Sequence, residues 1–208
     1  MLAIHKTSSG VGVSNSYIAG DGADGIIIDA GARADDIRKM VAKSGMKPAM
    51  IVLTHCHFDH IEYVDEIRAE YGIEAAIHAG DADAVADPMR NGSRLFGPPK
   101  ALSRPGRLLS DGQIIAAGSA EFQILHTPGH TPGGICILSG DGCALFSGDT
   151  IFKGAVGRTD LGGGSMGQLL ESIWSKIMAL DDGVRIYPGH GFPTTVGDER
   201  RTNPFLAT

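Results

Sequence analysis

Four side chains of the kinds that bind transition metals lie within six residues of one another. They are His55, His57, Asp59 and His60, in the segment THCHFDH, and an apolar run ends directly before them. Neutral imidazole and carboxylate are ligands that suit zinc, iron and manganese. A structural histidine normally occurs singly, so no packing requirement explains this many imidazoles in one turn. We therefore interpret the cluster as a metal site.

The spacing within the cluster divides its ligands between two positions. Along an extended segment alternate side chains share a face, so His55, His57 and Asp59 can point the same way. His60 follows immediately and must project differently, particularly where the chain turns into a helix. The arrangement predicts two neighbouring divalent metal ions as cofactors, with zinc as the first choice and iron or manganese as alternatives.

Three further polar side chains follow apolar runs in the same way. His130 comes after FQILHTPG, Asp149 after CALFSG and His190 after VRIYPG. Strand ends that lead into short loops hold ligands rigidly and keep them accessible to solvent. A layered fold would gather these ends along one edge, where the Asp149 carboxylate could bridge two metals. His126 has a helical spacing from His130, but the intervening Pro-Gly pair excludes a helix, so we interpret His126 as structural or as a residue that supports the ligands from behind.

Short strands and helices must position these residues. Strand-like runs are LAIH, SYIAG, GIIIDAG, AMIVLT and EAAIHAG in the first half, and QIIAAG, EFQILHT, GGICILSG, CALFSGD and VRIYPGH in the second. Helical patterns cover residues 33–44, about 65–72, about 81–87, 168–180 and a short segment near 198. Because strand runs bracket helices in both halves, the pattern favours two sheets with helices outside, in one domain over residues 1–208.

Composition argues against several classes of function. The chain has 208 residues and a formal net charge of −6 at pH 7, which is unfavourable for a nucleic-acid binder. No window approaches about eighteen apolar residues, so we predict no membrane span. The N-terminus lacks the pattern of a signal peptide, and three cysteines are too few for a disulfide framework. We therefore expect a cytoplasmic protein, as a monomer or a homodimer.

Together these motifs resemble the metallo-β-lactamase superfamily over nearly the whole chain. THCHFDH with the three later ligands fits its pattern, and IIIDAG fits its first motif, whose aspartate, here Asp29, usually supports the metal loop. The resemblance implies an α/β fold, the four-layer αββα sandwich of two mixed β-sheets flanked by helices. It also implies two metal sites that share Asp149, one formed by His55, His57 and His130, the other by Asp59, His60 and His190.

Within the superfamily the chain looks most like glyoxalase II, the hydroxyacylglutathione hydrolase. HTPGHTPGG, LFSGDTIF, GAVGRTD, YPGHG and ERRTNPF fit its short relatives. That resemblance implies hydrolysis of a small anionic thioester by a metal-bridging hydroxide, which the catalytic residue Asp59 orients. Arg158 would bind the anion, and we predict Lys153 and Tyr63 as further substrate contacts. Full-length glyoxalase II has a C-terminal helical domain for glutathione, and we expect this chain to lack it and therefore to show little preference among thiols.

Two features beside the ligands bear on the substrate. The segment 88–107 carries five cations and no acid in an acidic protein, namely Arg90, Arg94, Lys100, Arg104 and Arg107. It is either a solvated loop or a lid whose cations meet carboxylates on the thiol. We also expect Glu62 and Tyr63, next to the cluster, to narrow the entrance and disfavour bulky acyl groups.

Two other functions remain open. A persulfide dioxygenase of the same superfamily would bind one iron through His55, His130 and Asp149, a facial triad with open positions. The chain keeps YPGHG and the full set of ligands, which favours the hydrolase. The other alternative is a non-enzymatic, metal-stabilised binding module. Structural zinc sites are usually closed and rich in cysteine, whereas this ligand pattern contains none, so we rank the module below both enzymes.

Overall fold

Two six-stranded sheets form the centre of the computed structural model, which describes residues 2–207. In spatial order the first sheet contains β1 (Ala3–Ser8), β2 (Asn15–Gly20), β3 (Asp24–Ile28), β4 (Lys47–Val52), β5 (Glu74–His78) and β6 (Arg107–Leu109). The second contains β14 (Thr194–Thr195), β13 (Arg185–Pro188), β10 (Ala144–Gly148), β9 (Ile135–Ser139), β8 (Ala120–His126) and β7 (Ile114–Ala117). A short ribbon pairs β11 (Ile151–Phe152) with β12 (Ala155–Val156).

Both sheets are mixed, and their parallel pairs define the edge at which the predicted ligands meet. β3, β4, β5 and β6 pair parallel, whereas β1, β2 and β3 pair antiparallel. In the second sheet β10 pairs parallel with β13, and the remaining pairs are antiparallel. Parallel neighbours carry their carboxyl ends to the same edge of a sheet, so the loops after β4, β10 and β13 lie at one end of the molecule.

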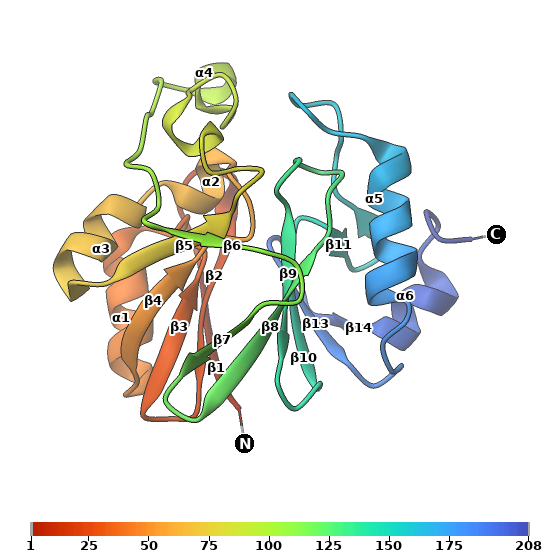
Figure 1. The fold of residues 1–208 in the computed structure, drawn as a ribbon, viewed down its shortest axis with the longest axis horizontal. Helices are drawn as coiled ribbons and strands as arrows, with labels where there is room; N and C mark the ends of the chain where they lie inside the picture. Colours follow the sequence, from red (N-terminus) through yellow and green to blue (C-terminus); the bar gives the residue numbers. More distant parts are fainter. Residues whose placement is uncertain (1, 208) are drawn as a thin grey trace.

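Helices cover the outer face of each sheet (Figure 1). α1 (Ala34–Ser44) and α3 (Val64–Tyr71) pack on the first sheet. On the second lie α5 (Met166–Ser172), which continues as a π-helical turn over Ile173–Ile177, and α6 (Val196–Thr202). The short helices α2 (Phe58–Ile61) and α4 (Ser93–Phe96) lie at the upper end in Figure 1. This four-layer arrangement confirms the αββα fold class predicted from the sequence.

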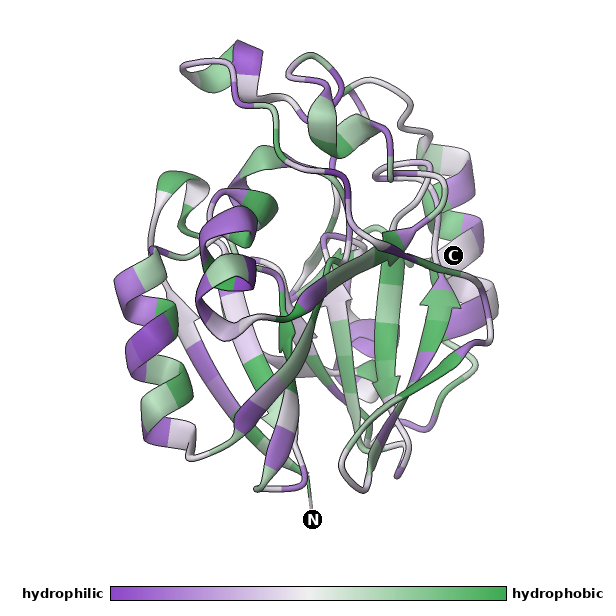
Figure 2. Cartoon of the chain, turned by 60° about the vertical axis from the view of Figure 1, so that its left-hand side comes forward, coloured by the Kyte–Doolittle hydropathy of each residue, from purple (hydrophilic) through white to green (hydrophobic). Residues whose placement is uncertain are grey.

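Apolar side chains fill three layers within the described part of the chain. One lies between the first sheet and its helices and includes Ile37 and Ile67, and the middle one, between the sheets, includes Phe122 and Phe146. The third, around Leu169, joins the second sheet to α5. Figure 2 shows purple and green residues mixed on the helices, as expected of elements with one face in solvent. None of the helices within residues 2–207 has the length and apolar character that a membrane span needs.

The structure differs from the sequence prediction where elements are short. The helix predicted over 81–87 is a turn followed by a 3-10 turn at Ala84–Ala86. The helix predicted from residue 168 begins at Met166, and its second half is π-helical. β6, β14 and the β11–β12 ribbon were not predicted, because two or three residues carry no readable periodicity. The predicted loop 88–106 contains α4.

We expect the substitution Gly129→Ala to destabilise the fold where the loop before His130 meets α5. Gly129 has φ of 137°, and a Cβ there would collide with the backbone of Leu169. Its carbonyl oxygen also accepts a hydrogen bond from Ser165 N, at 2.7 Å. Overpacking typically costs about 1–3 kcal/mol, and a positive φ at alanine adds about 1–2 kcal/mol. Chemical denaturation should therefore show a loss of about 2–5 kcal/mol in the free energy of unfolding.

The control for this prediction is Gly142→Ala. Gly142 also has a positive φ, 69°, but a Cβ there meets open space. The free energy of unfolding of this variant should fall by only about 1–2 kcal/mol. Equal losses in the two variants would show that contact with α5 does not constrain the loop before His130.

Candidate metal centre

The seven predicted ligands come together at one edge of the sandwich, from segments far apart in the sequence. Each follows the end of a strand: His55, His57, Asp59 and His60 follow β4, and His130, Asp149 and His190 follow β8, β10 and β13. The helix α2, which carries Asp59 and His60, marks this edge in Figure 1. The stacking of the two sheets therefore brings the ligands of both halves into one site.

The first group of ligands consists of His55, His57 and His130. Their ligand atoms lie within 4.8 Å of one another, and all three residues are buried. Nδ1 of His57 lies 2.8 Å from Nε2 of His130, which in turn lies 3.2 Å from Nε2 of His55. A neutral imidazole has only one N–H donor, so three ring nitrogens that converge in this way suit a shared cation better than mutual hydrogen bonds.

The second group consists of Asp59, His60 and His190, whose ligand atoms also lie within 4.8 Å of one another. Nε2 of His190 lies 3.2 Å from Nε2 of His60 and 3.3 Å from Oδ2 of Asp59. His190 and Asp59 are partly exposed, whereas His60 is fully buried. This position is therefore the more open of the two toward solvent.

Asp149 lies between the two groups. Its Oδ1 is 3.3 Å from Nε2 of His60, and its Oδ2 is 3.5 Å from Nε2 of His190 and 3.6 Å from Nε2 of His130. Among the described residues, nothing donates a hydrogen bond to the buried Oδ1. An unsatisfied buried carboxylate oxygen is costly unless a cation binds it. The residues present therefore fit two metal ions that share the Asp149 carboxylate.

The pKa values of the first group favour the neutral imidazole, which is the form that binds a metal. Burial, together with the nearby His130 ring, lowers the pKa of His57 to about 3. Burial also holds the pKa of His55 well below its usual range, with the neighbouring His60 and His130 rings acting in the same direction. Protons therefore compete weakly for these two ligands at neutral pH.

Around His60 the carboxylates outweigh burial. Burial alone would lower the pKa of His60, but Asp149 and Asp29 raise it well above its ordinary value. Burial likewise opposes ionisation of Asp149, yet His60 and its neighbours hold the pKa of this carboxyl well below the usual range. The centre is therefore electronegative and stabilises positive charge, as a site for divalent cations must.

Asp29 lies behind the ligands rather than among them. Its Oδ2 accepts hydrogen bonds from Nδ1 of His60 and Oγ1 of Thr54, both at 2.8 Å, and its Oδ1 accepts one from Thr54 N at 2.8 Å. Thr54 Oγ1 is also 3.0 Å from Nδ1 of His55. Asp29 thereby aims the Nε2 atoms of both rings at the centre, the usual task of a carboxylate behind metal-binding histidines. It does so from a backbone φ of 56°, which is unfavourable for a residue other than glycine.

A second buried carboxylate behind the ligands, Asp81, was not predicted from the sequence. Its Oδ2 accepts hydrogen bonds from Cys56 N at 3.0 Å and Thr131 Oγ1 at 2.7 Å, and its Oδ1 accepts one from Gly133 N at 2.7 Å. Cys56 separates His55 from His57, and Thr131 follows His130 directly. Asp81 therefore ties together the two loops of the first ligand group, which come from different sheets. Nothing in the segment HAGDAD indicates that Asp81 has these hydrogen-bond partners.

A pocket of about 490 Å³ opens over the centre. Five ligands form its floor, namely His57, Asp59, His130, Asp149 and His190. Its walls are Gly12, Phe58, Asn91, Gly92, Phe96, Phe152, Ala155, Val156, Arg158 and Leu161. This volume is typical of a site for a small molecule.

Of the three predicted substrate contacts, only Arg158 is among the described residues that line this pocket. Tyr63 instead packs against the apolar core beneath Lys100, whose Nζ lies 5.3 Å from the centre of the ring. Lys153 is exposed at the turn between β11 and β12. Glu62 Oε1 pairs with Lys100 Nζ at 2.7 Å. Glu62 and Tyr63 therefore do not line this pocket, contrary to the expectation that they narrow its entrance.

The segment 88–107 reaches the pocket, but with apolar and amide groups rather than cations. Asn91, Gly92 and Phe96 line it, whereas Lys100 pairs with Glu62, and Arg104 pairs with Asp83 at 3.3 Å. The described residues that line the pocket therefore include none of the five cations that the lid interpretation assigned to the substrate.

Comparisons with known proteins agree on one family. A family model described as the metallo-beta-lactamase superfamily matches residues 9–190. An uncharacterized protein of Mycobacterium leprae is 37% identical, and the alignment covers 92% of this chain and 93% of that protein. The probable metallo-hydrolase YqgX of Bacillus subtilis is 34% identical over 93% of this chain and 92% of its own. The hydroxyacylglutathione hydrolase GloC of Haemophilus influenzae is 33% identical over 92% and 91%.

Solved structures share the whole architecture. The B3 metallo-beta-lactamase BLEG-1 superposes with a TM-score of 0.93 at 35% identity, covering 99% of this chain and 100% of its own. TTHA1623, solved in a di-iron-bound form, has a TM-score of 0.87 at 32% identity and covers 97% and 99%. ETHE1 from Myxococcus xanthus has a TM-score of 0.80 at 26% identity and covers 97% and 83%.

We expect Asp81→Ala to weaken metal binding although Asp81 is not a ligand. The substitution leaves three hydrogen-bond donors without their acceptor. Loss of stability should be on the order of 3 kcal/mol, and metal affinity should fall about 10–100-fold, as for other residues that orient ligands. Chemical denaturation and competition with a chelator measure the two effects.

Asp83→Ala is the matched control, because Asp83 belongs to the same turn but is exposed, and its partner Arg104 is exposed as well. A surface pair of this kind contributes only about 0–1 kcal/mol, so this variant should bind metal like the parent protein. Parental metal affinity in Asp81→Ala would contradict the role of Asp81 in joining the two loops.

Proposed function

The chain belongs to the metallo-β-lactamase superfamily, and on that premise we propose that it is a binuclear metal-dependent hydrolase of thioesters. The observation that carries the proposal is the position of Asp149. Its carboxylate contacts both ligand groups, and among the described residues its buried Oδ1 receives no hydrogen bond. The name of the relative from Haemophilus influenzae, hydroxyacylglutathione hydrolase, supports the choice of a thioester.

Divalent metals in these two groups would supply Lewis acidity and lower the pKa of a water molecule. The residues of the chain then have separate tasks. His55, His57 and His130 hold one position rigidly, while the more open group with His190 and Asp59 leaves room for substrate. Zinc suits these nitrogen and oxygen ligands, and so do iron and manganese.

Asp59 is the residue that we propose to orient the attacking water. It lines the pocket, and its Oδ2 lies 3.3 Å from Nε2 of His190. Burial raises the pKa of Asp59, but the hydrogen bond with His190 and the His60 ring outweigh it and lower this pKa below its usual value. The carboxylate is therefore ionised at neutral pH and can accept a hydrogen bond from water.

The chemistry of the pocket also supports a thiol as the leaving group. Apart from the predicted metal ligands, the described residues that line it include no histidine, lysine, tyrosine, cysteine or carboxylic acid that could donate a proton to a poor leaving group. A thiol has a pKa of about 8.5, so it departs as a thiolate without prior protonation. An alkoxide or amine would need such a donor.

A mononuclear iron dioxygenase is the second candidate. Its three ligands also converge, since Nε2 of His130 lies 3.2 Å from Nε2 of His55 and 3.6 Å from Oδ2 of Asp149. The equally close approach of Asp59, His60 and His190 favours the binuclear hydrolase, because a single iron would leave that second group without a cation.

We expect the purified protein to hold about two metal ions per chain and to hydrolyse thioesters. Asp149→Ala should lose both metals, because Asp149 is the ligand that contacts both groups. Elemental analysis and a thiol-release assay measure this, and Asp181→Ala, which removes an exposed carboxylate elsewhere, is the control. One iron per chain, with oxygen uptake on a persulfide and no thioester hydrolysis, would support the dioxygenase instead. Full metal occupancy in Asp149→Ala would show that Asp149 does not bridge.

We expect Arg158 to bind a carboxylate on the thiol part of the substrate. Arg158 lines the pocket, and its guanidinium pairs with Asp160, with Nε–Oδ1 at 2.6 Å and Nη2–Oδ2 at 2.9 Å. Arg158→Ala should raise KM about tenfold for an ester of a carboxylate-bearing thiol and much less for a neutral one. Asp160→Asn should act in the opposite direction, because it frees the cation. Equal losses on both esters in Arg158→Ala would mean that the pair only shapes its own loop.

A further inference from the structure

The pocket over the metal centre has apolar walls, which neither the ligand pattern nor the resemblance to a hydroxyacylglutathione hydrolase explains. Phe58 and Phe96 come from the first half of the chain. Facing contributions from the second half are Phe152, Ala155, Val156 and Leu161. Isolated exposed apolar residues are common. Apolar side chains that converge over a reactive centre, in contrast, indicate that the ligand has an apolar part that binds there.

The first wall is held rigidly to the metal centre. The rings of Phe58 and Phe96 stack with their centres 5.5 Å apart and their planes at 19°. Phe58 follows the ligand His57, and its backbone N donates to Asn91 O at 2.9 Å. The Asn91 side chain in turn donates to Val85 O at 3.1 Å and to Lys100 O at 2.8 Å. Phe96 is 53% exposed, and it contacts this anchored segment through the stacked ring of Phe58.

The facing wall is also anchored. Phe152 pairs with Ala155 across the β11–β12 ribbon, and its ring centre lies 6.2 Å from that of His190. The buried Glu199 accepts a hydrogen bond from Gly154 N at 2.8 Å, and Asn203 Nδ2 donates to Ala155 O at 3.1 Å. The ribbon is therefore fastened to α6, and the apolar walls are formed in advance of binding.

The charges around the pocket leave these walls without polar partners for a ligand. Lys100 is paired with Glu62, and Arg158, the cation that lines the pocket, is paired with Asp160. A hydroxyl or charged group pressed against the phenyl rings would lose its hydrogen bonds to water without replacement, which is unfavourable. An alkyl or aryl group there gains from leaving water.

We propose that the acyl group of the substrate is an apolar chain of several carbon atoms, which binds between Phe58 and Phe96 on one side and Phe152 and Leu161 on the other. The proposal rests on the thioester hydrolase function, since that reaction places the carbonyl at the ligand floor, and the proposed contact of Arg158 with the thiol part leaves the apolar walls to the acyl chain. Water forms the new C–O bond as the C–S bond breaks, so the acyl group leaves as a carboxylate, with release of the thiol and one proton. Small hydroxyacyl groups are poor substrates.

The test is a series of thioesters of one small neutral thiol, from acetyl through butanoyl and hexanoyl to octanoyl, with lactoyl as the polar member. kcat/KM should rise by about two- to fourfold per methylene until the pocket is filled, where fourfold corresponds to ~0.8 kcal/mol per buried CH₂. A flat series, or a lactoyl ester hydrolysed faster than the octanoyl ester, would overturn the proposal and leave the hydrolase function intact.

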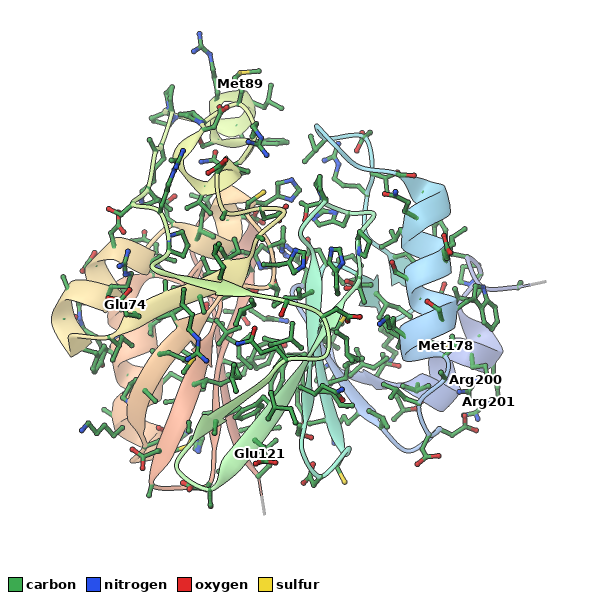
Figure 3. All side chains as sticks on the ribbon, viewed as in Figure 1. Glu74, Met89, Glu121, Met178, Arg200 and Arg201 are labelled. Atoms are coloured by element: carbon green, nitrogen blue, oxygen red, sulfur yellow. The ribbon has the colours of Figure 1, made fainter. Side chains whose placement is uncertain are left out.

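The variant Phe96→Ala removes half of the stacked wall and should lower the ratio of octanoyl to acetyl activity by about tenfold. Phe96→Leu should restore most of it. The matched control is Leu95→Ala, since Leu95 is exposed in the same short helix but does not line the pocket. Met89→Ala is a second control, because Met89 lies at the outer tip of this segment (Figure 3). A fall of the same size in both controls would show that the segment acts through its folding alone.

Calorimetry with alkanoates separates failure of this proposal from failure of the hydrolase function. Acetate, butanoate, hexanoate and octanoate should bind the metal-loaded protein with a Kd that falls with chain length, and Phe96→Ala should weaken this dependence. Such binding without hydrolysis of any thioester would reject the proposed reaction but retain the apolar site. A Kd that does not change with chain length would reject the apolar site.

Discussion

The burial of Asp149 among imidazoles is the constraint on which the site depends. A carboxylate with an unsatisfied buried oxygen is costly inside a protein, and a cation bound to the Oδ1 atom of Asp149 removes that cost. The four-layer fold makes this arrangement possible, because β4 and β10 end at the same edge of two stacked sheets. The apolar layers around Ile37, Phe122 and Leu169 form the core that supports this edge.

Two further buried carboxylates hold the ligand side chains in the positions that metal binding requires. Asp29 sets the ring of His60 through Nδ1 and reaches His55 through Thr54, so it acts within the first sheet. Asp81 joins the backbone beside His55 to the loop beside His130, so it acts between the sheets. Ligands held in this way lose little conformational freedom when metal binds, and the rigidity of their hydrogen-bonded support maintains affinity.

The parts of the site that were predictable from sequence are those encoded in short, local patterns. The run from His55 to His60 is recognisable because it places four metal-binding side chains close together in the sequence. The strands before His130, Asp149 and His190 are recognisable by their apolar runs. The alternation of strands and helices in both halves predicted two sheets with helices outside, and the resemblance to the superfamily implied the αββα order of the layers. Asp81 was not predictable, because its partners lie far along the chain and a single acid after a strand is ordinary. The position of Tyr63 was not predictable either. Tyr63 adjoins the ligands in sequence, but α3 begins directly after it and its side chain packs against the core.

For the segment 88–107, amino-acid composition did not predict which side chains reach the pocket. Five cations suggested an electrostatic lid, but ion pairs with Glu62 and Asp83 engage two of them, and the side chains that reach the pocket are Asn91 and Phe96. Binding energy from the non-reacting part of a substrate raises the rate only if it is used to position the reacting carbonyl. A stacked pair of rings that adjoins the ligand His57 can do this, because any chain packed against it is placed relative to the metal floor. The selectivity of the site is therefore expected to come from shape and apolar contact at the acyl end, with Arg158 acting at the thiol end.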